Sequence, residues 1–195
     1  MPQRRYRIEW PGEDGVLAAV EPTMDEVAAH ADELAEAYND PHNAPMMGHT
    51  ESYSVKDVVE HFRQMREEGA RPFLLFRDGR LMGDADVRGM DAGRAEFAVM
   101  VGARAAQGKG LGTRFALMLH AFAFRVLALG RLYVTIVPKN AASRRLFEKL
   151  GYQLAQDVAA RAYVDEEDDI AMSIARADFE RRHAGALDGI RIVAR

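Results

Sequence analysis

Residues 107–112 read Gln-Gly-Lys-Gly-Leu-Gly, between an apolar segment that ends at Val101 and a longer one that begins at Phe115. The first segment is typical of a β-strand, and the second has apolar residues at helical spacing. A glycine-rich turn between a strand and a helix can surround phosphate oxygens with backbone N–H groups, and the helix N-terminus adds positive partial charge. The loop therefore predicts an anion-binding site, with a purely structural tight turn as the alternative.

Two other phosphate-binding loops do not fit this pattern. A Walker A loop requires G-x4-G-K-[ST], but Gly102 and Gly108 are one residue too far apart and Gly110 stands at the Ser/Thr position. A Rossmann loop requires G-x-G-x-x-G at the start of a βαβ unit, whereas the spacing here is G-x-G-x-G. The preceding strand also belongs to a hairpin series, which Asp78-Gly79 indicates. The loop thus belongs to neither class of nucleotide-binding protein.

The remaining sequence predicts one α/β domain over residues 1–195, with a core at about 16–176, a short N-terminal extension and a C-terminal tail (177–195). The helix after the glycine-rich loop is apolar on most sides, so we expect it to be buried and to end at Gly130. Strands are expected at 16–20, 73–76, 81–87, 96–101, 132–137, 152–164 and 170–174, and the other helices at 23–38, 55–68 and 141–150, with a short helix after 174.

The composition excludes several classes of protein. The chain has no cysteine, which removes disulfides, cysteine-rich zinc sites and thiol nucleophiles, and it has no HExxH-like spacing, so no metal is expected. Its net charge of −4 comes from interspersed acids and bases, unlike the basic surface of a nucleic-acid binder. The most apolar stretch, 115–129, contains His120 and Arg125 and is too short to cross a membrane. Since the N-terminus has no apolar leader, the expected location is the cytoplasm.

A second motif follows the loop after one predicted helix and one predicted strand. Residues 140–152 read Asn-Ala-Ala-Ser-Arg-Arg-Leu-Phe-Glu-Lys-Leu-Gly-Tyr. Together the two motifs resemble the GNAT superfamily of N-acyltransferases. Its signature [QR]-x-x-G-x-[GA] is met by Gln107, Gly110 and Gly112, and its segment N-x-x-[SA]-x-x-x-[YFL]-E-K-x-G-[FY] is met by the second motif. The joint match over 93–152 is specific, whereas the six-residue loop alone is not.

The resemblance covers about 16–176, and the segments at 38–48 and 119–134 resemble the branch that contains the ribosomal-protein N-terminal acetyltransferases. It implies the α+β GNAT fold, in which a mixed, mostly antiparallel central sheet carries helices on both faces. The sheet is expected to splay between its fourth and fifth core strands, here 96–101 and 132–137.

The resemblance also implies that acetyl-CoA binds in this opening as the acyl donor. The pantetheine arm would lie between the two strands and bond to exposed backbone, while the loop would hold the phosphates. Asn140 resembles the family's asparagine that bonds the pantetheine arm. The expected contacts are Met100, Val101, Gln107, Gly108, Lys109, Gly110, Leu111, Gly112, Thr113 and Asn140.

Transfer to an amine needs a base, because most amines are protonated near neutral pH. By its distance from the loop, Glu96 matches the catalytic glutamate of the histone-acetylating members. The structural alternative for Glu96 is an ion pair with Arg94 or Arg71. The family stabilises the oxyanion with a backbone N–H near a bulge in this strand, and by spacing that group belongs to Met100.

Many family members donate a proton to the departing thiolate from a tyrosine, and here Phe147 occupies that position. The resemblance implies Ser143 as the substitute, with Tyr152 as the second choice. The structural alternative for Ser143 is a bond to backbone near the cap of its helix. Two loop histidines, His42 and His49, are expected to border the acceptor site or to face water.

The resemblance and these residues indicate an N-acetyltransferase that moves an acetyl group from acetyl-CoA to a primary amine by direct attack in a ternary complex. The acceptor is a protein N-terminus or a small amine such as a polyamine or an aminoglycoside, and the acidic run at 165–169 attracts a cationic acceptor or forms a solvated turn. Neither nucleic acid nor membrane is expected as a partner, and a homodimer is left open. The alternatives are an acyltransferase that uses another acyl-CoA, and a non-catalytic acyl-CoA-binding module of the same fold.

Overall fold

The computed structural model describes residues 4–12, 15–48, 51–102, 107–164 and 166–195. Within these residues the strands are β1 (Tyr6–Gly12), β2 (Gly15–Val20), β3 (Arg71–Arg77), β4 (Arg80–Asp91), β5 (Arg94–Val101), β6 (Arg131–Ile136), β7 (Gln153–Leu154), β8 (Ile170–Ala175) and β9 (Arg191–Ala194). The helices are α1 (Met24–Asn39), α2 (Asn43–Met46), α3 (Val55–Glu67), α4 (Leu111–Arg125), α5 (Ala141–Leu150), α6 (Val158–Arg161) and α7 (Arg176–Leu187).

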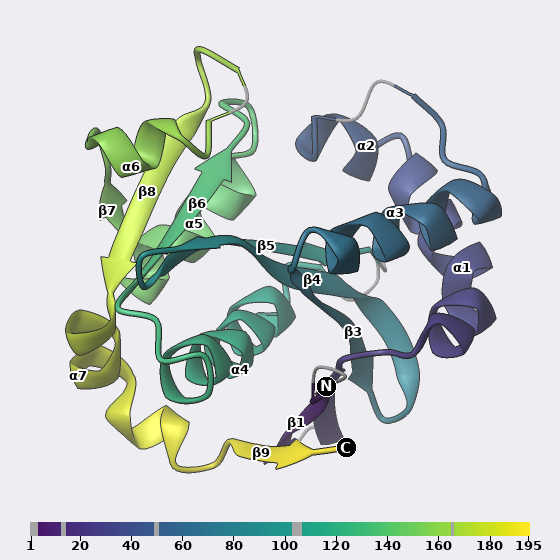
Figure 1. Ribbon diagram of the computed structural model, residues 1–195, viewed down its shortest axis with the longest axis horizontal. Coiled ribbons are helices and arrows are strands. Elements are labelled where there is room, and N and C mark those ends of the chain that lie inside the picture. Colours follow the sequence, from purple (N-terminus) through teal and green to yellow (C-terminus); the bar gives the residue numbers. More distant parts are fainter. Residues whose placement is uncertain (1–3, 13–14, 49–50, 103–106, 165) are drawn as a thin grey trace.

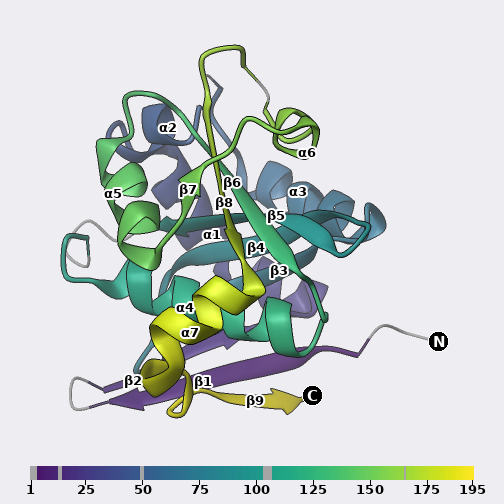
Figure 2. The ribbon, with the colours of Figure 1, turned by 90° about the vertical axis from the view of Figure 1, so that its left-hand side faces the viewer.

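All strands of the described residues join one sheet in the order β7-β8-β6-β5-β4-β3-β2-β1-β9 (Figure 1). Neighbouring strands run antiparallel, except that β5 and β6 are parallel. Helices α4, α5 and α7 pack against one face of the sheet, and α1 and α3 pack against the other (Figure 1, Figure 2). The predicted α+β fold, with a mixed, mostly antiparallel sheet and helices on both faces, is confirmed.

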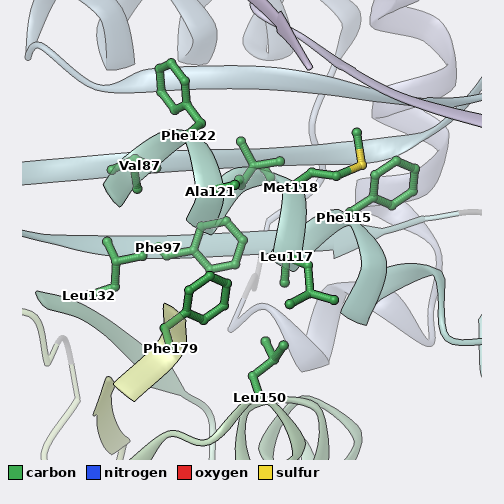
Figure 3. Packing of buried hydrophobic residues seen from close by; sticks show 14 of the residues in the cluster. Val87, Phe97, Phe115, Leu117, Met118, Ala121, Phe122, Leu132, Leu150 and Phe179 are labelled. Carbon is green, nitrogen blue, oxygen red and sulfur yellow. The ribbon is translucent and has the colours of Figure 1, made fainter. Parts of the chain in front are cut away.

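Helix α4 is the centre of the larger core. Its residues are apolar almost all the way round, and such a helix is stable when it is buried on several sides. Phe115 and Phe122 are fully buried (Figure 3), and the Phe122 ring lies 5.0 Å from the ring of Phe73 between centroids. Truncating a phenylalanine in such a position to alanine costs about 3–5 kcal/mol. Because His120 of α4 also contacts Phe97 of β5, the core fixes α4 against the strand that precedes the loop.

Helices α1 and α3 form a second, smaller core with β3. Leu34, Phe62 and Leu74 are its buried members from these three elements. Both helices begin with a capping box, at Thr23 for α1 and at Ser54 for α3. The second core therefore covers the sheet face opposite α4.

The sheet opens between β5 and β6. These strands pair only from Arg94 to Glu96 with Arg131 to Tyr133, although β5 continues to Val101. Beyond the last pair the two strands diverge, as Figure 1 shows. The predicted splay between the fourth and fifth core strands is therefore confirmed, and it exposes backbone that needs other hydrogen-bond partners.

Helix α4 is shorter than the sequence predicts, because it ends at Arg125 and not near Gly130. Ala128 adopts a left-handed φ of +55°, and the N–H of Leu129 bonds to the carbonyl oxygen of Ala123. The chain thus leaves the helix in a wider turn, and the apolar side chains that suggested further helix pack in that turn.

The strand predicted over 152–164 is wrong. Pairing with β8 covers only Gln153 and Leu154, and the chain then enters α6. Asp157 starts this short helix, since its side chain accepts a hydrogen bond from the N–H of Ala160 at 2.9 Å. A local cap therefore outweighs the weak strand pattern in this segment.

The segments predicted as N-terminal extension and C-terminal tail add strands to the sheet. Strand β1 pairs with β2 on one side and with β9 on the other. Ile8 of β1 and Phe179 of α7 are fully buried in the larger core, and the Tyr6 ring lies 5.4 Å from that of Phe122. These segments thus contribute to the same core as residues 16–176.

Candidate active site

The glycine-rich loop ends at the N-terminus of α4, beside the opening of the sheet. Gly108 and Gly110 have φ angles of +72° and +78°, in the left-handed region that favours glycine, and Gly110 is the N-cap of α4. No side chain of the described residues caps this helix end, so its first N–H groups need another acceptor. A Cβ on either glycine would meet no described atom within 4 Å. The loop therefore presents backbone donors to open space, which suits an anion.

Gln107 fixes the loop to the preceding strand. Its Nε2 donates hydrogen bonds to the carbonyl oxygen of Val101 at 2.8 Å and to Oδ1 of Asn43 at 2.9 Å. Asn43 is buried, and its Nδ2 donates to the carbonyl oxygens of Ala37 and Gly102. Sequence reasoning missed Asn43 because 64 residues separate it from Gln107 and no motif contains it.

A cleft of about 680 Å³, here called the loop cleft, lies over the loop and beside α5. Lys139, Arg145 and Lys149 are part of its wall, and their charge favours the binding of phosphates. Lys109, which was expected to contact the cofactor, is not among its lining residues. The other expected contacts line the cleft: Met100, Val101, Gln107, Gly108, Gly110, Leu111, Gly112, Thr113 and Asn140.

A second cavity of about 520 Å³, here called the carboxylate cavity, lies against β4, β5 and the end of β6. Glu96 lines this cavity, and so do two aspartates of β4, Asp84 and Asp86. The residues that line both cavities are Met46, Met47, Val99, Met100, Asn140 and Ser143. The two cavities therefore meet where β5 and β6 have diverged.

Glu96 stands at the last paired position of β5 and β6, where the opening begins. It is buried, and its Oε2 accepts a hydrogen bond from Nε of Arg88 at 2.8 Å. The ion pair foreseen for Glu96 exists, but with Arg88 and not with the expected partners. Arg94 pairs with Asp91, and Arg71 pairs with Glu21.

Asp84 and Asp86 are the site residues that the sequence reasoning missed. In the β4–β5 ladder Asp84 stands opposite Met100 and Asp86 opposite Ala98, so both side chains lie on the same sheet face as that of Glu96. Oδ2 of Asp84 accepts a hydrogen bond from the hydroxyl of Tyr38 at 2.8 Å. Burial raises the pKa of Asp84 to about 7 and that of Asp86 to about 6. Two aspartates two residues apart in a strand place both carboxylates on one face, and this pattern was visible in the sequence. Without the strand pairing, however, it is equally typical of a strand face exposed to solvent.

Asn140 and Ser143 join the two cavities from α5. Asn140 caps this helix, since its Oδ1 accepts a hydrogen bond from the N–H of Ser143 at 3.0 Å. Its Nδ2 donates to the carbonyl oxygen of Met46 at 2.9 Å, which ties α5 to α2. The bond foreseen from the Ser143 side chain to backbone is not found among the hydrogen bonds of the described residues; its backbone N–H bonds the cap instead, and Ser143 lines both cavities.

Tyr152, the second choice as proton donor, is buried away from both cavities. Its hydroxyl lies 2.6 Å from Nε2 of His120, whose Nδ1 lies 2.6 Å from the carbonyl oxygen of Ala116. A carbonyl only accepts, so Nδ1 carries the proton and Nε2 accepts from Tyr152. Burial lowers the pKa of His120 to about 3 and raises that of Tyr152 well above its ordinary value. This pair is therefore structural, and Phe147 contacts it through the Tyr152 ring.

Three remaining expectations concern the bulge near Met100, the two loop histidines and the acidic run. The bulge implied near Met100 is not present in the β4–β5 ladder, which runs without a register shift from Glu96 to Val101. His42 lines the loop cleft and not the carboxylate cavity, into which α3 contributes His61 instead. His49 lies outside the described residues, as does residue 165 of the acidic run.

Two general features of the described residues complete the site's surroundings. They contain no group of three or more histidine, aspartate or glutamate side chains arranged to hold a metal ion. None of the helices in the described ranges has the length and apolar character needed to cross a bilayer.

A family model described as an acetyltransferase (GNAT) domain matches residues 23–153. The chain belongs to the GNAT acetyltransferase family. Members of this family are acetyl-CoA-dependent N-acetyltransferases, and the chain is one of them. No curated protein sequence matches it significantly.

Several solved structures of GNAT proteins share the fold. Mycobacterium smegmatis RimJ, in complex with CoA-disulfide, superposes with a TM-score of 0.72 at 20% identity over 95% of both chains. The aminoglycoside acetyltransferase AAC(6')-Ib, in complex with coenzyme A, gives 0.70 at 20% identity over 85% of this chain and 98% of that chain. The spermidine N-acetyltransferase from Vibrio cholerae, in complex with CoA and spermine, gives 0.68 at 16% identity over 84% and 97%. Identities this low establish the fold and not the acceptor.

Proposed function

We propose that this GNAT protein moves an acetyl group from acetyl-CoA to a primary amine by direct attack within a ternary complex. The observation that carries the proposal is the meeting of the loop cleft with the carboxylate cavity at the divergence of β5 and β6. One cavity has the backbone donors and basic residues that a phosphate-bearing donor needs. The other has the carboxylates that a cationic amine needs. The donor and the acceptor would thus enter from different sides and react where the cavities join.

For the donor, we assign the phosphates to the loop and to the N-terminus of α4. The pantetheine arm would bond to the backbone that β5 exposes after Glu96, as an added strand does at a sheet edge. Gly112 would act indirectly, since a Cβ there would approach Cδ1 of Leu146 to 2.9 Å and require that side chain of α5 to move. These assignments predict that changes in the loop weaken CoA binding before they affect chemistry.

For the reaction, the amine nitrogen attacks the thioester carbonyl carbon, and the carbon–sulfur bond breaks as the amide forms. Glu96 takes the proton that the nitrogen loses, directly or through one water molecule. The thiolate is a weak base, so it leaves with little help, and we assign its protonation to the hydroxyl of Ser143, a residue that lines both cavities.

Without a bulge, Met100 cannot supply the oxyanion donor, because the N–H of Gly102 donates to the carbonyl oxygen of Met82 and, by strand alternation, that of Met100 also faces β4. The N–H groups of Val99 and Val101 face the opening, and one of them would donate to the oxyanion.

The acceptor can belong to either of two classes. A protein N-terminus fits the resemblance of residues 38–48 and 119–134 to the branch with the ribosomal-protein N-terminal acetyltransferases. A small amine fits the structural similarity to the aminoglycoside and spermidine acetyltransferases. The two remaining alternatives are transfer of another acyl group and binding of acyl-CoA without catalysis. Of these, the buried carboxylates of the second cavity favour a catalyst of amine acylation.

The test is a thiol-release assay with acetyl-CoA against a panel of N-terminal peptides, linear amines and aminoglycosides. Initial rates at several acceptor concentrations should give intersecting double-reciprocal lines, because no cysteine is present to hold the acyl group. Parallel lines, or an acetylated protein trapped by mass spectrometry, would contradict direct attack. Succinyl-CoA as donor tests the acyl group, and tight CoA binding with no turnover of any amine would favour the binding module.

A further inference from the structure

Two aspartates that line the carboxylate cavity, Asp84 and Asp86, each have one buried oxygen without a hydrogen-bond partner. Oδ1 of Asp84 and Oδ1 of Asp86 are the only buried side-chain oxygen or nitrogen atoms in the described residues that no hydrogen bond satisfies. The two aspartates occupy successive positions on one face of β4, and both residues are more than nine-tenths buried. Buried polar groups are almost always paired, because an unpaired one loses its hydration without compensation. Two adjacent exceptions in one cavity therefore indicate a ligand that supplies donors.

The charges around these oxygens point to a cation. Among the described residues that line the cavity, Asp84, Asp86 and Glu96 are acidic, and Arg88 is the arginine. Arg88 bonds Glu96 at 2.8 Å and reaches Oδ2 of Asp86 only at 3.5 Å, and Tyr38 supplies a neutral donor to Asp84. One guanidinium thus faces three carboxylates. Burial, which disfavours the charged form, raises the pKa of both aspartates. An ammonium group would supply both the charge and the missing donors.

Resting on the proposed acetyl transfer, we propose that Asp84 and Asp86 bind a second ammonium group of the acceptor, which is therefore a small amine with at least two cationic nitrogens. The reacting nitrogen lies near Glu96, and Asp86 stands opposite Ala98, two positions further along β5. With about 3.3 Å per residue and about 4.8 Å between strands, the Cα atoms of Glu96 and Asp86 are roughly 8 Å apart. Side chains bring the charged groups closer, so the separation suits nitrogens joined by a short carbon chain or one sugar ring. A peptide N-terminus with neutral side chains would leave both aspartates unpaired.

The experiment compares matched amines in the acetyl-CoA thiol-release assay. The linear pair is 1,4-diaminobutane and 1-aminobutane, and the sugar pair is kanamycin and glucosamine. The wild-type protein should prefer the polycationic member of one pair by about tenfold or more in kcat/KM, the usual worth of a charge-assisted hydrogen bond. The pair that shows the preference identifies the source of the second ammonium.

Two variants assign this preference to the cavity. Asp84→Asn and Asp86→Asn should each lower the ratio of the two kcat/KM values by about tenfold, with calorimetric CoA binding as the check of folding. Asp91→Asn, an exposed aspartate at the end of the same strand, should keep the wild-type ratio. Equal turnover of monoamine and polyamine, or a preference that both cavity variants retain, would overturn the proposal.

The remaining outcomes separate this inference from the proposed function. Acetylation of N-terminal peptides in preference to every polyamine would overturn the second-cation site and leave the acetyltransferase intact. If no amine is acetylated, the proposed acetyl transfer fails, and calorimetry of 1,4-diaminobutane and kanamycin with the CoA-bound protein decides the site. Binding that both aspartate variants weaken would support it, and absence of binding would refute it.

Discussion

Replacing Asp84 with asparagine should make the free protein more stable near and above neutral pH. Burial raises the folded-state pKa of this carboxyl from 3.8 to about 7. The folded protein therefore holds the proton more tightly than the unfolded chain, and ionisation of Asp84 destabilises the fold. The free energy of unfolding therefore has its full value below about pH 4, where the carboxyl is protonated in both states. It falls as the pH rises, until the carboxyl of the folded protein has ionised above about pH 7. Asparagine keeps an oxygen that accepts from Tyr38 but carries no charge.

The size of the effect follows from the two pKa values. A rise of about three units corresponds to roughly 4 kcal/mol in the free energy of unfolding once the carboxyl is fully ionised. About 2–3 kcal/mol of this falls between about pH 5 and about pH 8. The other ionisable groups that face the cavity are common to both proteins, but three of them, Tyr38, Asp86 and Arg88, interact with the replaced carboxyl, so this value is the size of the whole effect of removing its charge. The remaining two are His61 and Glu96.

The assay is urea denaturation of wild type and Asp84→Asn in steps between these pH values, without CoA or amine. The free energy of unfolding of the variant should exceed that of wild type increasingly as the pH rises. Asp91→Asn is the control, because Asp91 is on the same strand with a side chain that is 73% exposed, and its difference from wild type should stay small. An Asp84→Asn difference that is constant within about 0.5 kcal/mol across this range would refute the reasoning and weaken the case for a cation site.

Three further predictions concern the donor site and the chemistry. Gly110→Ala should weaken CoA binding by about tenfold or more in calorimetry. Gly69→Ala is the matched control, because both glycines have φ near +80° and open space around them, and it should leave CoA binding unchanged. Equal affinities of the two variants for CoA would exclude the loop as the phosphate site. Glu96→Gln should lower kcat/KM by roughly 10²–10⁴ with near-normal CoA affinity and partial recovery at high pH, and a rate within about threefold of wild type would exclude Glu96 as the base. Ser143→Ala should lower kcat by about tenfold or less, because the thiolate leaves readily, and a loss beyond about 100-fold would show that its protonation limits the rate.

The parts of the fold and site that the sequence predicts are those that neighbouring residues determine. The loop at 107–112 and the helix that begins after Asn140 are contiguous motifs, so their residues already specify glycine conformations, a cap and a strand on either side. Where a local signal was weak, the prediction was wrong. The segment after Tyr152 has no strand partner beyond Leu154, and the cap at Asp157 directs it into a helix.

The parts that the sequence does not predict depend on register between distant strands. Asp84 and Asp86 become site residues only because β4 pairs with β5 so that they stand opposite Met100 and Ala98. A shift by one residue would place them in the larger core. Likewise, Arg88 faces Glu96 across the same ladder, which a search among nearby arginines such as Arg94 could not show.

The separation of β5 and β6 explains why the proposed donor site, base and acceptor site lie next to one another. Because the β4–β5 ladder has no register shift between Gly83 and Arg88, it holds Asp84, Asp86 and Glu96 on one face in fixed order. Because β6 leaves β5 directly after Glu96, the backbone beyond that residue is open to the donor. Glu96 is thus the only one of the three carboxylates at the boundary, while both aspartates lie on the adjacent strand. This arrangement is the reason for proposing proton transfer at Glu96 and binding of a second cation at Asp84 and Asp86, and under that proposal the two carboxylates are buried in order to recognise a cation.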